Sequence, residues 1–362
     1  MKRTAHHDSD ATVVRLGVDT SKKYLHLHGV NSAEQVVLRK RLLRDDVLSY
    51  FANLPACIIG IEACSGSHYW ARELTKLGHT VRIIPADFVT PYRKSQAAKN
   101  DANDAEAICE AVSRPSMRFV AVKTEQQQAV LALHTARQGL IEQRTALINR
   151  LRSILVEFGC WFPLKPSQLK DGIAVMLARG ESALPTLVRD MVQEMSEQLR
   201  SMEESIASYD RRIAELNKQD PVAQRIRELV GIGELTASAV VATIADATVF
   251  KNGRQMGAWL GLTPKQYSTG GKSRLGKITK RGDTYLRTLL VQGARSAMRA
   301  ALVRAPDKQT RVGAWIVSLY GRLGYHKTLV AIANKHARMI WAMMAKGEKY
   351  DANAWKRYQP AA

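Results

Sequence analysis

A succession of short apolar runs near the N-terminus most constrains how this chain can fold. Residues 12–42 contain three such runs joined by tight turns, which is typical of antiparallel strands. Further along, apolar runs alternate with segments of helical periodicity. The predicted strands are 12–19, 24–30, 35–42, 56–62, 80–85 and 118–123, and the predicted helices are 45–53, 68–77 and 101–113.

This order of elements, three hairpin strands followed by alternating helices and strands, predicts an RNase H-like α/β sheet. We place this first domain at residues 12–123. The full length of 362 residues leaves room for one or two further domains. Because 46% of the residues are hydrophobic, the chain can bury real cores, which excludes a wholly disordered protein.

Residues 124–220 carry the apolar spacing of paired helices. Apolar residues repeat every seven positions from Leu133 to Ile154, and a second set steps mostly by 3 and 4 from Leu187 to Leu216. Residues 161–166 interrupt the pattern with an aromatic pair and two prolines. We therefore predict a long coiled-coil helical hairpin, with dimerisation as its expected role.

The net charge of +21 is concentrated in the last third of the chain. Residues 1–120 hold 17 basic and 13 acidic side chains, residues 121–220 hold 13 of each, and residues 221–362 hold 24 basic and 7 acidic. A surplus of this size favours a polyanionic partner. We predict a mainly helical, basic C-terminal domain at residues 221–350.

Several classes of protein are disfavoured by the sequence. No apolar run approaches the roughly 18 residues of a membrane span, and the N-terminus lacks the apolar stretch of a signal peptide. The four cysteines show neither a C-x-x-C pair nor a zinc spacing. We expect a protein of the reducing cytoplasm with no membrane partner.

Four carboxylates lie at positions where a charged side chain needs a counter-ion or a metal. Asp19 and Glu62 end apolar strands, and Asp101 and Asp104 are three residues apart on one face of a predicted helix. Oxygen ligands of this kind suit Mg²⁺, and metal-bound carboxylates are used in phosphoryl transfer. Individually, a turn at Asp19, a salt bridge at Glu62 and a helix cap at Asp101 would also account for them.

The segment from Gly261 to Leu290 is rich in glycine and in basic residues, and its central part carries no acid. An extended, glycine-rich basic loop can follow a phosphate backbone closely. The residues predicted to contact nucleic acid are Lys265, Thr269, Gly270, Lys272, Arg274, Lys277, Lys280, Arg281 and Arg287.

A second glycine-containing segment precedes it. Gly231-Ile232-Gly233, between two helical stretches, is typical of a helix-hairpin-helix, in which backbone amides approach a phosphate. A tight helix–helix turn without a ligand accounts for the glycines equally well.

Three motifs carry a family resemblance. GVDTSKK, IGIEACSG and KNDANDA, in this order and at these separations, resemble the DEDD transposases of bacterial insertion sequences, whose N-terminal domain is similar to the RuvC Holliday-junction resolvase. The resemblance covers most of the chain. It implies catalytic, Mg²⁺-binding roles for Asp19, Glu62, Asp101 and Asp104.

The resemblance also implies a catalytic serine in the basic loop, directly before a glycine. Here Thr269 precedes Gly270, and Ser268 stands one residue earlier. We favour Ser268, because a primary hydroxyl is the less hindered nucleophile, and Thr269 stays the alternative.

For such a family the resemblance implies RNA-guided recombination. A structured non-coding RNA from the element pairs with donor and target DNA, and homodimers assemble into tetramers at the bacterial nucleoid. The alternatives from the residues are a metal-dependent junction resolvase or nuclease without a serine intermediate, and a non-catalytic nucleic-acid scaffold.

Overall fold

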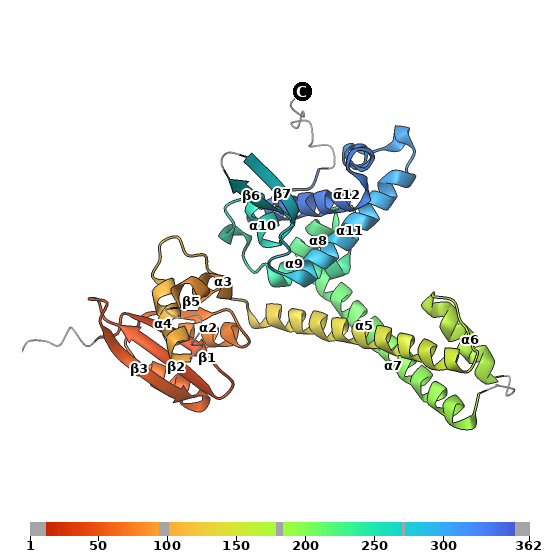
Figure 1. Cartoon of the computed structure of the whole chain (residues 1–362). Helices are drawn as coiled ribbons and strands as arrows, with labels where there is room; N and C mark the ends of the chain where they lie inside the picture. The colour runs from red at the N-terminus through yellow and green to blue at the C-terminus, as the bar shows by residue number, and fades with distance from the viewer. Residues whose placement is uncertain (1–11, 94–100, 179–183, 270–271, 352–362) are drawn as a thin grey trace, which may run out of the picture. The chain divides into compact units, whose positions relative to one another are not determined.

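The structure is a computed structural model that describes residues 12–93, 101–178, 184–269 and 272–351. Its contacts divide the chain into two compact units (Figure 1). One is Met1–Glu125 with Ile244–Lys251, and the other is Gln126–Thr243 with Asn252–Ala362. The expected division into three domains is a finer one and stays a prediction.

The first unit is built on a five-stranded mixed sheet. Its strands are β1 (Arg15–Thr20), β2 (Tyr24–Val30), β3 (Val36–Leu43), β4 (Ile58–Glu62) and β5 (Thr80–Ile84). They lie in the order β3-β2-β1-β4-β5, antiparallel from β3 to β1 and parallel from β1 to β5. The N-terminal α/β region therefore has five of the six strands that the sequence predicts, with β1 at the centre.

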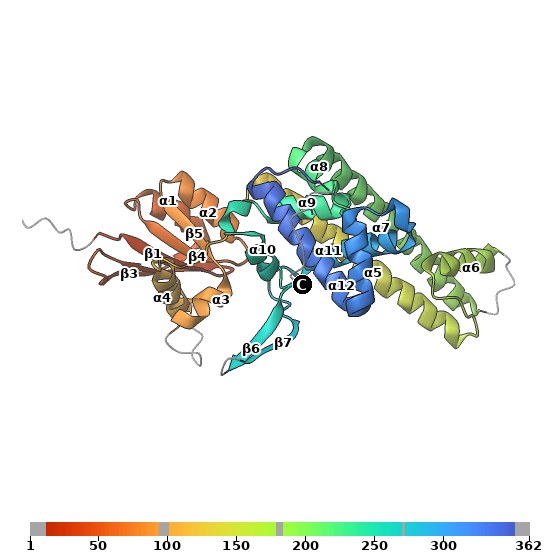
Figure 2. The same ribbon diagram turned by 90° about the horizontal axis from the view of Figure 1, so that it is seen from above.

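Helices cover both faces of this sheet (Figure 2). The helices are α1 (Val47–Ala52), α2 (Ser67–Lys76), α3 (Ala86–Val89) and α4 (Asp101–Val112). Phe51 of α1 and Trp70 and Leu74 of α2 pack into the main core with strand residues, while α4 lies on the opposite face and packs with Ile84 and Val89. The expected strand at 118–123 is reduced to one bridge between Val120 and Ile83.

Two long helices begin the second unit. They are α5 (Glu125–Glu157) and α7 (Thr186–Gln219), and α6 (Pro166–Ala178) packs at one end of the pair. Arg137 of α5 pairs with Asp210 of α7, whereas Leu155 shares a core with Val192, so the two helices run antiparallel. The hairpin forms as expected in outline, and α6 was not foreseen because the periodicity stops at Trp161.

The rest of the second unit is mainly helical, with one β-hairpin. Its elements are α8 (Pro221–Arg227), α9 (Glu234–Thr243), α10 (Gly253–Trp259), β6 (Pro264–Thr269), β7 (Lys272–Ile278), α11 (Thr284–Val303) and α12 (Arg311–Ala345). The basic segment expected as a loop is thus largely an antiparallel hairpin. Among the described helices, none is long and apolar enough to cross a membrane.

Candidate functional site

Two of the predicted carboxylates lie at the same edge of the sheet. Asp19 is the fifth residue of β1 and Glu62 is the last of β4, and these strands are parallel neighbours. Because parallel strands end at the same edge, the two side chains are brought together although 43 positions separate them in the sequence.

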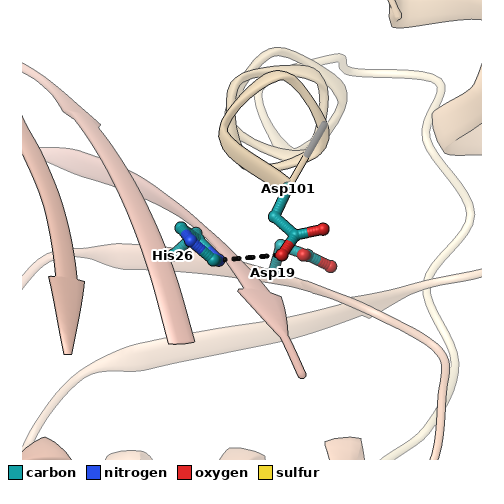
Figure 3. Close-up of side chains that lie close together, drawn as sticks. All are labelled: Asp19, His26 and Asp101. Atoms are coloured by element: carbon teal, nitrogen blue, oxygen red, sulfur yellow. Dashed lines mark ion pairs between the residues drawn. The ribbon is translucent and has the colours of Figure 1, made fainter. Parts of the chain in front are cut away.

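The first turn of α4 adds Asp101 and Asp104 to this edge. One ligand atom each of Asp19, Asp101 and His26 lies within 4.8 Å of the others (Figure 3). His26 lies opposite Asp19 in the antiparallel register of β1 and β2, and its Nδ1 is 3.5 Å from Oδ2 of Asp101. Asp104 is 5% exposed and therefore buried.

A pair of glycines allows α4 to pack so closely. Gly17 and Gly60 are register partners in β1 and β4. A Cβ atom at Gly17 would lie 2.0 Å from the carbonyl oxygen of Ala105, and one at Gly60 would lie 2.9 Å from Cβ of Val112. The glycines before Asp19 and Glu62 therefore bring the helix against the strands that carry the carboxylates.

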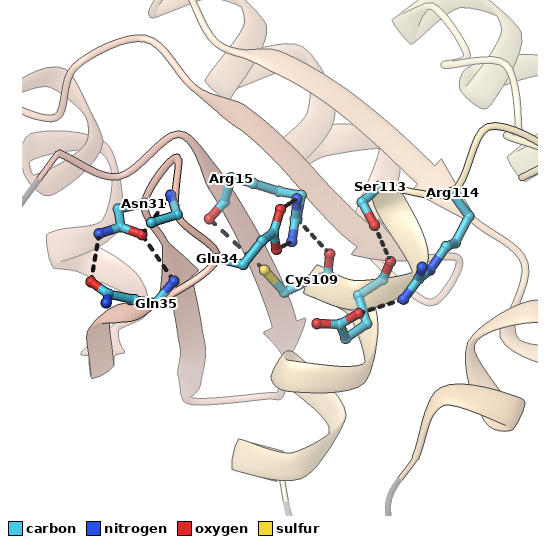
Figure 4. Close-up of polar contacts among 9 residues, drawn as sticks. Arg15, Asn31, Glu34, Gln35, Cys109, Ser113 and Arg114 are labelled. Carbon is cyan, nitrogen blue, oxygen red and sulfur yellow. Dashed lines mark hydrogen bonds and ion pairs between the residues drawn. The ribbon is translucent and has the colours of Figure 1, made fainter. Parts of the chain in front are cut away.

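The other end of α4 is tied to β1 through Arg15. The buried Arg15 side chain donates from Nε to the carbonyl oxygen of Cys109, at 3.0 Å, and from Nη1 to Oε1 of Glu34, at 2.8 Å (Figure 4). Hydrogen bonds to a charged group in a buried setting hold geometry well. Arg15 therefore ties the C-terminal half of α4 to β1, the strand that carries Asp19.

Arg93 forms ion pairs with two of the carboxylates, and the one with Glu62 is also a hydrogen bond. Its Nη2 is 3.3 Å from Oε2 of Glu62, and its Nε is 2.7 Å from Oδ1 of Asp104. It follows a 3-10 turn, Thr90–Tyr92, after α3. Neither Arg93 nor His26 was among the residues predicted from the sequence.

The pKa of Asp19 reflects its burial and the other carboxylates near it. The pKa of Asp19 is raised to about 6, first by burial of its carboxyl group and then by repulsion from Asp101, Asp104 and Glu62. Asp19 therefore lies in the field of all three other predicted acids. This concentration of carboxylate oxygens fits a divalent cation such as Mg²⁺ or Mn²⁺, and the nitrogen of His26 suits Mn²⁺ better than Mg²⁺.

The second set of predicted residues lies on the β6–β7 hairpin. Ser268 is exposed, pairs in register with Ser273, and accepts a hydrogen bond of 2.8 Å from Nε2 of Gln266. Thr269 pairs in register with Lys272. The side chains of Thr269 and Lys272 and the whole of Gly270 lie outside the described residues.

Basic side chains surround Ser268 along the hairpin. Lys265, Arg274 and Lys277 are exposed on its strands, and Lys280 is exposed just beyond β7. Arg281 is exposed at the hairpin base. These residues are thus exposed as a phosphate-binding surface would require, and their contact with nucleic acid stays a prediction.

Arg287 is placed differently from the other predicted contacts. Its side chain is buried, and its guanidinium donates to the carbonyl oxygens of Leu260 and Arg281 and to Oγ1 of Thr284. These bonds hold the base of the hairpin, which favours a structural role for Arg287 over a phosphate contact. The sequence could not distinguish the two, because both use a basic residue next to the loop.

Comparison with known proteins identifies the family over most of the chain. A family model described as "Transposase IS116/IS110/IS902 family" matches residues 223–309, and a DEDD transposase model of the IS110 type matches residues 16–159. A family 20 transposase of Pseudomonas aeruginosa is 44% identical over 337 residues, covering 93% of this chain and 98% of the relative. The chain belongs to the IS110 family of insertion-sequence transposases.

Two further relatives support this assignment. The transposase for insertion sequence element IS1328 of Yersinia enterocolitica is 38% identical and spans 92% of this chain and 98% of its own length. The transposase for IS1111A of Coxiella burnetii is 36% identical, over 94% and 92% respectively. The protein is therefore an enzyme that cleaves and recombines DNA.

The transposase carries a basic groove beside the glycine pair Gly231 and Gly233. Gly231 has a φ of +90° and packs against Gly293. A Cβ atom at Gly231 would lie 2.2 Å from the carbonyl oxygen of Gly293. Gly233, in contrast, is exposed and has open space around it. Gly231 is thus explained by helix packing, whereas packing does not require a glycine at 233.

This groove has a volume of about 450 Å³, and Arg295 and Arg299 line it together with Gly231. None of the lining residues is acidic. The nearby carboxylate of Glu234 is neutralised by Arg227, at 2.6 Å, and bonded by Nδ2 of Asn217, at 2.6 Å. The charged residues that line the groove, Arg295 and Arg299, are therefore both basic.

Proposed function

We propose that this transposase exchanges DNA strands with a divalent-metal site at Asp19, Glu62, Asp101 and Asp104 and with Ser268 as nucleophile. The observation that carries the proposal is the gathering of the four carboxylates at one edge of the sheet. The strand order β3-β2-β1-β4-β5, with α4 packed across β1 and β4, supports an RNase H-like, RuvC-like catalytic domain.

Mg²⁺, when bound at these carboxylates, would supply a Lewis acid that stabilises charge on a phosphoryl group. Asp19 and Glu62 would present their oxygens from the ends of two paired parallel strands. Asp101 and Asp104 would do so from a helix fixed by Gly17, Gly60 and Arg15. The chain's own contribution is this rigid placement of hard oxygen ligands.

Ser268 would form the covalent link to DNA. Its Oγ attacks phosphorus, the scissile phosphorus–oxygen bond breaks, and the leaving sugar oxygen takes up a proton while the serine loses one. One phosphate ester replaces another, so the step needs no external energy source. Gln266, which donates to this Oγ, would hold the hydroxyl in place.

Nucleic acid would lie on the basic surfaces of the second unit. Lys265, Arg274 and Lys277 on the hairpin supply cations for a phosphate backbone, and the groove with Arg295 and Arg299 supplies a second contact. The other proposed contacts are Lys272, Lys280, Arg281, Thr269 and Gly270, whereas the buried Arg287 is left out.

We propose further that a structured RNA chooses the DNA sites. The sequence contains no zinc-finger spacing, no basic-region zipper and no evident base-reading helix-turn-helix, so specificity needs another source. The coiled-coil hairpin of α5 and α7 would be the element through which subunits dimerise and then form tetramers. The protein would act in the bacterial nucleoid.

A cleavage assay tests the metal-site part of this proposal. The full-length protein is incubated with the ends of its own element and Mg²⁺, and nicked DNA is measured. We expect Asp19→Asn and Glu62→Gln to lose cleavage by at least about a hundredfold while DNA binding is retained. The matched control is Asp45→Asn, which changes the same charge at an exposed position in the same unit.

Two outcomes would count against the proposal. Full cleavage by Asp19→Asn would exclude a catalytic role for the carboxylates. Cleavage that depends on Asp19 but proceeds unchanged in both Ser268→Ala and Thr269→Ala would instead favour a hydrolytic, metal-dependent resolvase.

A further inference from the structure

Arg93 occupies the space between two carboxylates of the acidic site. Its guanidinium is 3.3 Å from Oε2 of Glu62 and 2.7 Å from Oδ1 of Asp104. The side chains are only 23%, 19% and 7% exposed for Arg93, Glu62 and Asp104. Carboxylates withdrawn from water to this degree need a compensating cation, and here the chain supplies one of its own.

The backbone of Arg93 is held in place by its neighbours. Its amide donates to the carbonyl oxygen of Thr90, at 3.2 Å, and closes the 3-10 turn. Tyr92, the preceding residue, packs against the core that contains Val89 and Ile108. The starting point of the Arg93 side chain is therefore fixed on the same core that carries α4.

The guanidinium of Arg93 and a divalent ion would compete for the same oxygens of Glu62 and Asp104. Arginine pairs with carboxylates through a planar fork of donors, and the guanidinium of Arg93 lies against one oxygen each of Glu62 and Asp104. Mg²⁺ demands oxygen ligands in near-octahedral geometry at about 2.0–2.1 Å, which is closer than any nitrogen donor approaches. The two cations would also repel each other across the same carboxylates.

We propose that Arg93 is a built-in competitor for the divalent ion: it neutralises Glu62 and Asp104 in the metal-free transposase and leaves them when the ion binds. This inference rests on the proposed metal site and adds a means by which the chain sets the metal concentration at which that site fills. Arg93 acts here through the carboxylates, so it is a positioning residue for the site.

Titration with Mn²⁺ alone tests the inference on the full-length protein. We expect Arg93→Gln to bind Mn²⁺ about tenfold more tightly than the wild type in isothermal titration calorimetry. Arg93→Lys should fall between the two, because an ammonium group is a point charge that cannot bridge both carboxylates as the fork does. Arg118→Gln, which removes an exposed arginine of the same unit, should bind like the wild type.

Thermal unfolding without metal gives a second readout that does not depend on activity. Arg93→Gln removes the guanidinium that pairs with the half-buried Glu62 and the buried Asp104, so its Tm should lie below that of the wild type in the presence of a chelator. Saturating Mn²⁺ should bring the two Tm values together. A structural role alone would lower the Tm in both conditions.

The outcomes separate two kinds of failure. Equal or weaker Mn²⁺ binding by Arg93→Gln, alongside binding by the wild type that Asp19→Asn abolishes, would overturn the competition and leave the metal site intact. Absence of Mn²⁺ binding by the wild type would overturn the metal site and this inference with it. If Arg93→Gln does not fold, Arg93→Lys decides: tighter binding than the wild type supports the inference, and equal binding overturns it.

Discussion

His134 is a buried histidine at which three helices of the second unit meet. It lies on α5, is 2% exposed, and bonds through Nδ1 to the hydroxyl of Tyr285 on α11 and through Nε2 to Oγ of Ser238 on α9. Both distances are 3.0 Å. Burial lowers the pKa of His134 to about 4, so the ring is neutral in the folded protein at neutral pH.

The lowered pKa of His134 predicts that the folded protein loses stability in acid. Unfolding restores an ordinary histidine pKa of about 6.5, so between pH 6.5 and 4 the unfolded chain binds a proton that the folded chain does not. The stabilisation is complete above pH 6.5 and is lost as the pH falls toward 4. His134 should account for about 2–3 kcal/mol of this loss at pH 4.5.

Denaturant unfolding at pH 7 and pH 4.5 measures the effect. His134→Gln keeps an amide that can bond to Tyr285 or Ser238 but does not titrate, so its stability should change less between the two pH values than that of the wild type. An unchanged pH dependence would show that His134 is not the responsible group.

At the scale of single residues, the carboxylates were predictable and their partners were not. Asp19 and Glu62 stand out because a charge ends an apolar run, a signal that needs no tertiary structure. His26 could have been found only from the register that places it opposite Asp19. Arg93 lies 31 positions from Glu62 and 11 from Asp104, and no local pattern connects it to them.

Among the elements, α4 depends most on small residues beneath it. Gly17→Ala would drive a methyl group into the carbonyl oxygen of Ala105, at 2.0 Å, where backbone cannot yield cheaply. We expect it to reduce the free energy of unfolding by at least about 2 kcal/mol and to weaken the acidic site by displacing Asp101. Denaturant unfolding provides the measurement.

Gly139→Ala is the matched control for this substitution. Gly139 lies within α5, and a Cβ there would meet nothing within 4 Å. Because alanine is the better helix former, the control should be neutral or stabilise by up to about 1 kcal/mol. A similar loss of unfolding free energy in both variants would show that close packing at Gly17 is not the cause.

Arg287 holds the base of the β6–β7 hairpin. Arg287→Ala removes the donors that bind the carbonyl oxygens of Leu260 and Arg281. We expect faster hydrogen–deuterium exchange in residues 261–282 and lower strand-transfer activity, with little change in α12. Arg295→Ala, an exposed arginine on the same helix, should leave exchange in the hairpin unaltered.

The elements themselves followed from local pattern where apolar periodicity was strong. All five strands of the first sheet were anticipated near their observed bounds, because each is a short apolar run between turn residues. The basic segment was expected to be a loop because its strands β6 and β7 have no apolar face of their own. Only pairing between the two strands defines them.

For the whole molecule, the split in charge follows the division between the acidic site and the basic surfaces. The acidic site lies in the first unit, and the basic hairpin and the groove with Arg295 and Arg299 lie in the second. The surplus charge in residues 221–362 is therefore concentrated where we propose that nucleic acid binds.

If an RNA guides the transposase, that RNA should stay bound during purification. Transposase purified from cells that carry its element should retain one discrete RNA encoded by that element, identified by sequencing. Its retention should fall steeply as salt rises, because phosphate contacts release counterions. Recovery of only heterogeneous cellular RNA would contradict guidance and leave the transposase assignment unaffected.

The central claim is that Ser268 forms a covalent bond to DNA during strand exchange. Mass spectrometry of peptides from a trapped transposase–DNA adduct tests it most directly, with Ser268→Ala, Thr269→Ala and Asp19→Asn in parallel. We predict a nucleotide attached to Ser268, an adduct that persists in Thr269→Ala, and none in Ser268→Ala. A nucleotide attached to Thr269, or an adduct that survives in Ser268→Ala, would contradict the claim.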